Sequence, residues 1–226
     1  MCKFLVLRTS LLSVLFYLKI HFVLMRTLFV YNHPYDGSYC NALLCAALNG
    51  VSRCGGESDI INLDKDGFDP VMSSSDLKAF ATARKEPGKA LMMLDKKVID
   101  YKARLEKANH LVFIFPVWWM LMPALTKGFI DKVIFPSVAY EYGAKGQMLC
   151  RLWNLKRVTV VTTMGGPAQV YDTLMGNAVW RALSHGTFEA IGVEHCKWLN
   201  FDYVSGVSPE RRSEWLQQVE DYFALL

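Results

Sequence analysis

The segment from His33 to Asn41 has the residue types of a phosphate-binding turn. It follows Thr27–Tyr31, a run of β-branched and aromatic residues typical of a strand, and Ser38 can cap the helix that comes next. The N–H groups at a helix N-terminus attract anions, and Gly37 lets a ligand approach the backbone. The sequence has neither GxGxxG nor a GxxxxGK motif, so neither a dinucleotide-binding fingerprint nor a P-loop is indicated. An ordinary capped turn is the alternative.

Two adjacent tryptophans, Trp118 and Trp119, follow the continuous apolar run His110–Phe115, which Pro116 ends. A loop can turn both indole rings toward one crevice. Flat apolar walls with nearby backbone N–H groups suit a planar heteroaromatic ring. Packing of one or both rings in the core or in an interface is the alternative.

A pair of glycines, Gly165 and Gly166, follows the β-branched run Val158–Thr163. Glycines let the backbone come close to a ligand, and their N–H groups can donate to ring carbonyls. Tyr171 carries a hydroxyl that can donate a hydrogen bond to developing negative charge. A plain Gly-Gly-Pro turn is the alternative. Because all three loops follow strands, their joint presence favours a binding site over three unrelated turns.

The alternation of apolar strands with amphipathic segments predicts an α/β fold. The expected strands cover 27–31, 59–63, 110–115, 158–163 and 195–203, and the expected helices follow Ser38 and cover 76–84, 94–107, 123–134, 173–184 and 208 to the C-terminus. Strands that are apolar on both faces belong in a parallel sheet covered by helices on each side. We therefore predict a flavodoxin-like, doubly wound five-stranded parallel sheet of order 2-1-3-4-5, with ligands bound beyond the carboxyl ends of the strands.

Length and composition fit one globular domain. The chain has 226 residues, of which 52% are hydrophobic and 20% charged, which excludes disorder, collagen and a coiled coil. The net charge of +4 arises from 25 basic and 21 acidic residues, too little asymmetry to indicate a nucleic-acid partner. The six cysteines form no CxxC pair, so we expect no metal site, and reduced thiols favour a cytoplasmic protein.

Residues 1–24 are apolar but are interrupted by Arg8, Lys19 and His21. Their longest clean run, Leu11–Leu18, is far shorter than the ~20 residues that a membrane helix needs. We expect 1–24 to be an N-terminal extension outside the fold, and 25–226 to form the flavodoxin-like domain. A membrane or interface anchor is the second interpretation, without firm evidence for a membrane partner.

Six motifs in order resemble one family. They are His33-Pro-Tyr with Ser38 and Asn41, Asp66–Met72, Leu111–Trp119, Met122–Val133, Ala139–Tyr142 and Thr162–Pro167. Together they are similar to the NAD(P)H:quinone oxidoreductases of flavodoxin-like fold, over residues 26 to about 222. The resemblance implies a two-electron, ping-pong enzyme that moves a hydride from NAD(P)H, its co-substrate, through a flavin to a quinone or similar small aromatic acceptor. The stretch Phe68–Met72 resembles members that use FAD, so FAD is favoured and FMN stays possible.

The resemblance also implies roles for individual residues. The residues implied to contact the flavin are His33, Ser38, Tyr39, Asn41, Pro116, Val117, Trp118, Trp119, Met120, Thr163, Met164, Gly165, Gly166 and Tyr171. Tyr140 and Tyr142 match tyrosines that reach the substrate slot from a neighbouring subunit, which implies a homodimer, and Trp119 would also border that slot. Tyr171 and Asn177 take the catalytic positions. Asn177 stands where the mammalian member has a histidine, so a tyrosine–histidine charge relay is doubtful.

Two other functions stay open at this stage. The resemblance extends to potassium-efflux accessory flavoproteins, so a regulatory subunit of such a transporter is one alternative. A one-electron carrier of the flavodoxin type is the other, although carriers of that kind tend to be acidic and this chain has a net charge of +4.

Overall fold

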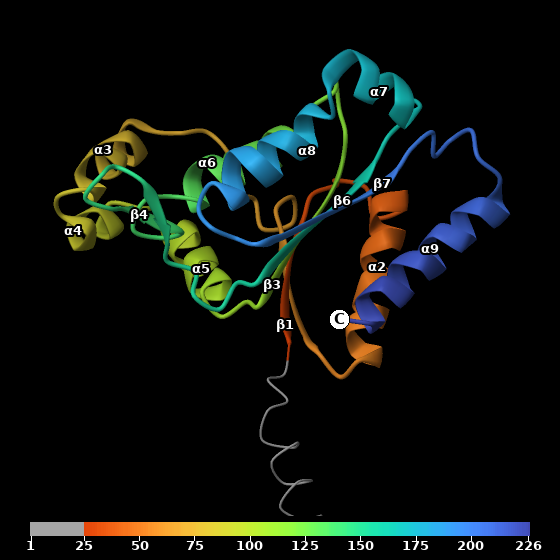
Figure 1. Cartoon of the computed structure of the whole chain (residues 1–226), viewed down its shortest axis with the longest axis horizontal. Coiled ribbons are helices and arrows are strands. Elements are labelled where there is room, and N and C mark those ends of the chain that lie inside the picture. The colour runs from red at the N-terminus through yellow and green to blue at the C-terminus, as the bar shows by residue number, and fades with distance from the viewer. Residues whose placement is uncertain (1–24) are drawn as a thin grey trace, which may run out of the picture.

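A five-stranded parallel sheet forms the centre of the protein (Figure 1). The computed structural model describes residues 25–226, so our predictions for 1–24 lie outside the described residues. The strands of the sheet are β1 (Arg26–Tyr31), β2 (Glu57–Asn62), β3 (His110–Pro116), β6 (Arg157–Thr163) and β7 (His195–Phe201). Their spatial order is β2-β1-β3-β6-β7, which confirms the predicted fold class and the order 2-1-3-4-5.

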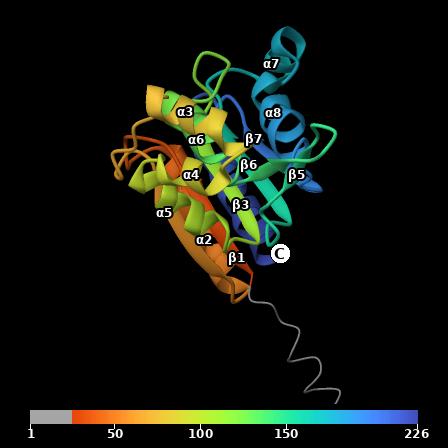
Figure 2. The ribbon, with the colours of Figure 1, turned by 90° about the vertical axis from the view of Figure 1, so that its left-hand side faces the viewer.

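Helices cover both faces of this sheet (Figures 1 and 2). One face packs against α2 (Tyr39–Arg53) and α9 (Pro209–Ala224), which share a core with Phe29. The other face packs against α5 (Lys96–Leu105), α6 (Ala124–Val133) and α8 (Ala178–Leu183). Every residue of β3 is buried because helices lie on both sides of it, as its continuous apolar sequence predicted.

The predicted helix starts are confirmed at two positions that frame the site. The Ser38 hydroxyl accepts a hydrogen bond from the Asn41 N–H at the start of α2. Ser208 caps α9 in the same way, with Pro209 and Glu210 in the first turn. Both helices therefore begin at the edge of the sheet where the strands end.

One predicted helix, 173–184, is wrong. The structure has α7 (Ala168–Met175), then Gly176 and Asn177 with φ values of 57° and 55°, then α8 and a π-helical turn, η1 (Ser184–Glu189). Gly176 supplies the left-handed residue that ends a helix, a stop signal that apolar periodicity does not show. The hairpin β4 (Tyr140–Tyr142) with β5 (Met148–Cys150) and the helix α4 (Pro87–Met92) were also not predicted.

A buried lysine fixes the loop between β2 and α3 (Ser74–Ala83). Lys132 Nζ donates to the carbonyl oxygens of Asp69 and Val71 at 3.2 and 3.1 Å, and lies 3.5 Å from Asp76 Oδ2. This loop also approaches α6 closely, because a Cβ on Gly128 would lie 2.3 Å from Pro70. Most of the Asp66–Met72 motif therefore forms a rigid support on one side of the sheet.

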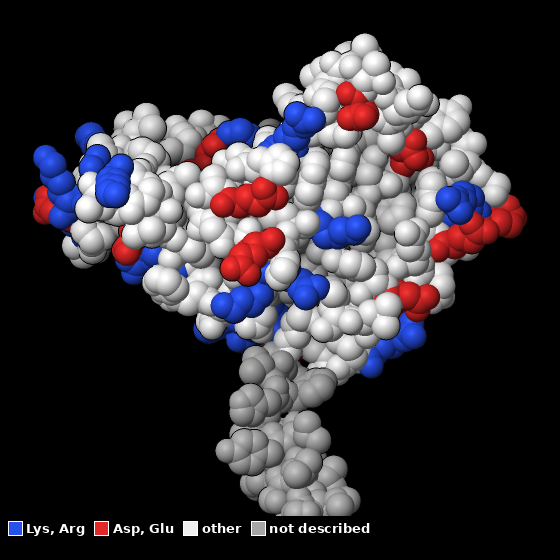
Figure 3. Space-filling view, in the orientation of Figure 1, with Lys and Arg blue, Asp and Glu red and all other residues white. Residues whose placement is uncertain are grey.

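Within residues 25–226 no helix combines the length and the apolarity needed to cross a bilayer. The same residues contain no cluster of three or more His, Cys, Asp or Glu side chains placed to hold a metal ion. Acidic and basic side chains are interspersed on the face seen in Figure 3.

Candidate active site

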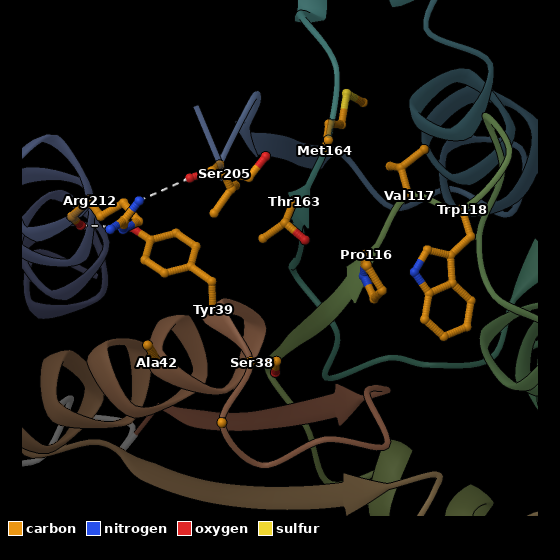
Figure 4. A pocket seen from close by; sticks show the side chains of 13 residues that line it. Ser38, Tyr39, Ala42, Pro116, Val117, Trp118, Thr163, Met164, Ser205 and Arg212 are labelled. Atoms are coloured by element: carbon orange, nitrogen blue, oxygen red, sulfur yellow. Dashed lines mark hydrogen bonds between the residues drawn. The ribbon is translucent and has the colours of Figure 1, made fainter. Parts of the chain in front are cut away.

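The carboxyl ends of four parallel strands surround one cavity of about 690 Å³. Tyr39 and Arg212 lie on one side of it, Pro116 and Trp118 on the other, and Thr163 between them (Figure 4). The lining residues are Gly37, Ser38, Tyr39, Ala42, Pro116, Val117, Trp118, Thr163, Met164, Gly165, Val204, Ser205 and Arg212. Three of the four contributing loops are those that the sequence singled out.

A second cavity of about 220 Å³ shares the walls Val117, Met164 and Gly165 with the first. Its lining residues are Val117, Trp119, Met120, Met164, Gly165, Gly166, Pro167, Val170 and Tyr171. The two cavities are therefore adjacent, and together they form one candidate site with a large and a small compartment.

The loop after β1 presents the N-terminus of α2 to the larger cavity. The first N–H groups of a helix have no partner within the helix, and the helix dipole adds positive potential there. Ser38 and Tyr39 line the cavity, whereas the Asn41 amide donates to the Asp36 carbonyl at 2.8 Å and does not line it. His33 lines neither cavity, and its ring meets Trp118 edge to face with centroids 6.2 Å apart. The end of the cavity at α2 is thus suited to an anionic group.

The loop after β3 forms a tight hairpin turn at residues 118–121. Trp118 and Leu121 exchange both backbone hydrogen bonds, at 2.9 and 3.0 Å. The two central residues, Trp119 and Met120, have φ values of 47° and 63°, as in a type I′ turn. Trp119 is 97% exposed and stands at the rim of the smaller cavity.

The loop after β6 offers backbone donors. Among residues 25–226, the N–H groups of Gly165 and Gly166 have no backbone acceptor, whereas the Met164 N–H donates to the Phe201 carbonyl at 2.9 Å. The Thr163 hydroxyl lies 3.2 Å from Cys40 Sγ. Burial raises the pKa of the Cys40 thiol to about 11, so this sulfur is neutral.

These two glycines are not required by the packing of the protein itself. A Cβ built on Gly165 or Gly166 would meet no heavy atom within 4 Å, and neither residue has a left-handed backbone. Since Gly165 lines both cavities, the space that its missing side chain leaves is cavity space. The small side chains and free donors therefore fit a polar ring edge held against the backbone, as a flavin would require.

A fourth loop, after β7, was missed at the sequence level. Val204 and Ser205 line the larger cavity together with Arg212 from the first turn of α9. The Tyr39 hydroxyl donates to the Arg212 carbonyl at 2.7 Å, and the Arg212 guanidinium donates to Val207 O at 2.9 Å. Burial raises the pKa of Tyr39 to about 12, so its hydroxyl keeps the proton. The capped helix start at Ser208, which follows the loop after the last parallel strand, was the available signal.

Tyr171 and Asn177 occupy different surroundings. The Tyr171 ring is buried and lines the smaller cavity, and its hydroxyl donates to the Met120 carbonyl at 2.9 Å and accepts from the Val179 N–H at 2.8 Å. Burial raises the pKa of Tyr171. Asn177 lines neither cavity and donates to Asp172 Oδ1 at 2.6 Å. The structure thus brings one of the two predicted catalytic residues to the site.

The two tyrosines predicted to bind substrate lie on the β4 strand, outside both cavities of their own chain. Their rings pack edge to face with centroids 5.5 Å apart, and Tyr140 is buried. Tyr142 lines a separate cavity of about 120 Å³ with Arg84 and Arg151. A role in this site would require them to come from a second copy of the chain.

Comparison with known proteins places the chain in a family of this fold. Residues 25–223 match the model of a family described as flavodoxin-like fold. NAD(P)H dehydrogenase (quinone) 1 of Cavia porcellus is 30% identical over 163 residues, which cover 66% of this chain and 56% of that protein. Ribosyldihydronicotinamide dehydrogenase (quinone) of Pongo abelii is 25% identical over 180 residues, covering 74% of this chain and 77% of that one. The chain thus spans little more than half the length of the Cavia protein.

Solved structures show the same fold. NAD(P)H:quinone oxidoreductase from Methanothermobacter marburgensis superposes with a TM-score of 0.76 at 22% identity, covering 88% of this chain and 96% of that one. An FMN-dependent NADH-azoreductase from Bacillus anthracis, in complex with FMN, superposes with a TM-score of 0.72 at 17% identity. The match covers 89% of this chain and 98% of that one. These relatives confirm the resemblance to the NAD(P)H:quinone oxidoreductases, and the chain belongs to the flavodoxin-like fold family.

Proposed function

We propose that the chain is a flavin-dependent NAD(P)H oxidoreductase with a quinone-like acceptor. The observation that carries this proposal is the pair of adjacent cavities at the carboxyl edge of the sheet, where the Gly165 and Gly166 N–H groups have no backbone acceptor and lie near the Trp118 and Trp119 side chains. Relatives named as quinone dehydrogenases and as an azoreductase support the same chemistry. The flavin, when bound, takes a hydride from NAD(P)H and passes two electrons to the acceptor.

The larger cavity would hold the cofactor. Its phosphate end would lie at Ser38 and the N-terminus of α2, and its ring between Trp118 and the segment 163–166, where N–H groups can donate to carbonyl oxygens. The cavity continues past Ser38 to Ser205 and the cationic Arg212. This extension supports FAD, with its second phosphate, over FMN.

The smaller cavity would hold the nicotinamide and then the acceptor. It shares walls with the larger one, so a flat molecule there would lie against the ring of the cofactor. One compartment used in turn by donor and acceptor produces ping-pong kinetics. Trp119 at its rim and a neighbouring subunit's Tyr140 and Tyr142 would narrow the entrance, which makes a homodimer part of the proposal.

Neither of the two residues at the catalytic positions of the family gains or loses a proton near neutral pH. Tyr171 keeps its hydroxyl proton at neutral pH because burial raises its pKa. Asn177 carries no group that titrates near neutrality, so our proposal contains no tyrosine–histidine relay. The described cysteines, Cys40, Cys45, Cys54, Cys150 and Cys196, are all free thiols, which is compatible with the proposed cytoplasmic location.

Steady-state oxidation of NADH and NADPH tests the proposal. The full chain, supplied with FAD or FMN, should consume NAD(P)H when menadione is added, and initial rates at several acceptor concentrations should give parallel double-reciprocal lines. A protein that binds flavin but shows no such turnover would instead fit the regulatory or one-electron-carrier alternatives. A protein that binds no flavin would refute all three.

A further inference from the structure

The turn at residues 118–121 is built from residues that do not favour its backbone. Both central positions of a type I′ turn need positive φ, which Asn and Gly adopt readily. Here those positions are Trp119 and Met120, with φ values of 47° and 63°. A turn of this sequence persists only if its surroundings hold it in place.

The interaction that holds the turn comes from Tyr171. Its hydroxyl donates to the Met120 carbonyl at 2.9 Å, at the second of the two left-handed positions. The same oxygen accepts from the Val179 N–H at 2.8 Å, in the first turn of α8. One phenol group therefore joins the turn after β3 to the start of α8, two segments that are more than fifty residues apart in sequence.

We infer that the Tyr171 hydroxyl is a latch that fixes the 118–121 turn and so shapes the wall of the smaller cavity. Its consequence for catalysis rests on the proposed function, whereas the latch itself does not. Trp119 and Met120 line the smaller cavity, so a turn that is free to move would enlarge or obstruct that compartment. Tyr171 is in this account a positioning residue for whatever binds there.

The latch differs from the role that the family resemblance implies. A phenol has one proton to donate, and here it is donated to Met120. While the latch is closed, Tyr171 has no proton left for developing charge on a ligand. The raised pKa of this buried hydroxyl keeps that proton in place at neutral pH.

The Tyr171 ring is held independently of its hydroxyl. It packs edge to face on Trp198 with centroids 6.5 Å apart, and Trp198 stacks on Trp180 at 6.0 Å. Tyr171→Phe therefore removes the two hydrogen bonds and keeps the aromatic packing. Tyr222→Phe is a matched control, because the Tyr222 hydroxyl lies 3.1 Å from Thr159 Oγ1 under α9, away from both cavities.

Amide hydrogen exchange on the full-length, flavin-loaded protein tests the latch directly. Since a net hydrogen bond is typically worth about a factor of five to ten, Tyr171→Phe should accelerate exchange at Val179, Trp118 and Leu121 on the order of 10-fold. Tyr222→Phe should leave these three amides unchanged. Unchanged exchange at Trp118 and Leu121 in Tyr171→Phe would overturn the inference.

A relaxed turn gives a second test. In the background Trp119→Asn/Met120→Gly the turn no longer needs external support. There, Tyr171→Phe should change exchange at Trp118 and Leu121 less than about twofold, while Val179 should still exchange faster because its own acceptor is lost. An undiminished effect at the turn amides would mean that Tyr171 does not act by holding the strained turn.

Kinetics separates the latch from a direct catalytic role. The latch predicts that Tyr171→Phe raises KM for NAD(P)H and for menadione on the order of 10-fold and lowers kcat less than about threefold. A hydrogen-bond donor to the transition state would instead lower kcat by roughly 10²–10³ with little change in KM, and that result would overturn the inference. If exchange responds as expected but the unaltered protein does not oxidise NAD(P)H, the latch stands and the proposed function fails.

Discussion

Replacing Gly165 by valine should weaken flavin binding and leave the stability of the protein without flavin unchanged. The glycine lines both cavities, a Cβ there meets no heavy atom within 4 Å, and its backbone is not left-handed. The folded chain can therefore accept a side chain at this position, so its free energy of unfolding without flavin should change by less than about 1 kcal/mol. The added carbons would occupy space that the flavin ring needs. Overpacking of that kind costs typically 1–3 kcal/mol, which is roughly a 5- to 150-fold rise in Kd.

The assay measures flavin affinity and stability on the same preparations. Titration of apoprotein with FAD or FMN, followed by the quenching of flavin fluorescence, gives Kd, and urea unfolding of the apoprotein gives the free energy of unfolding. Gly88→Val is the matched control, because Gly88 in α4 also meets nothing within 4 Å and lines neither cavity. It should leave Kd unchanged.

Either of two results would show that Gly165 does not serve the flavin. If Gly165→Val binds flavin as tightly as the unaltered protein, the ring does not lie against this backbone. If the variant loses several kcal/mol of stability without flavin, the glycine serves the fold, and its absence of neighbours has been misread.

Three further predictions concern stability. His110 is fully buried, and burial lowers its pKa to about 3. The unfolded chain takes up a proton on this histidine below pH 6.5 and the folded protein does not, so the free energy of unfolding is highest above pH 6.5 and decreases as pH falls toward 3. Urea unfolding should therefore show about 2 kcal/mol less stability at pH 5 than at pH 7 from this group, and His110→Gln should remove that part of the slope. Lys132→Met leaves the Asp76 carboxylate buried without its cation and should cost about 3 kcal/mol in the same assay; an unchanged midpoint would contradict this. Ser38→Ala removes the cap of α2 and should cost about 1 kcal/mol without flavin, together with weaker flavin binding, and an unaffected Kd would argue against phosphate at this helix.

The sheet could be predicted because the apolar composition of its central strands shows that both of their faces are buried. His110–Phe115 is apolar on both faces, as expected of a central parallel strand. Alternation with helices predicted the parallel sheet, and the order 2-1-3-4-5 is a common doubly wound arrangement that five such strands fit. The break between α7 and α8 was not predictable in this way, because it depends on left-handed backbone at Gly176 and Asn177 rather than on periodicity. The β4–β5 hairpin is too short to show an alternating pattern.

Three loops of the candidate site could be predicted, because each directly follows a strand that the sequence shows. Ser38, Trp118 and Gly165 were expected together and line one cavity. Arg212 was missed because it lies in the first turn of α9 beside Arg211, where an arginine resembles any exposed helical cation. The contact between Tyr171 and Met120 could not be anticipated either, since it joins two loops through a backbone carbonyl that leaves no mark in the sequence.

In the function that we propose, the loops after β1, β3 and β6 hold a redox-active flavin. The most direct test is the visible absorption spectrum of the purified full-length chain after incubation with FAD or FMN and removal of free flavin, followed by anaerobic addition of NADH or NADPH. Close to one flavin should stay bound per chain, and about one equivalent of reduced nicotinamide should bleach its absorption band. A colourless protein under these conditions, or a bound flavin that neither nucleotide reduces, would contradict the proposed function.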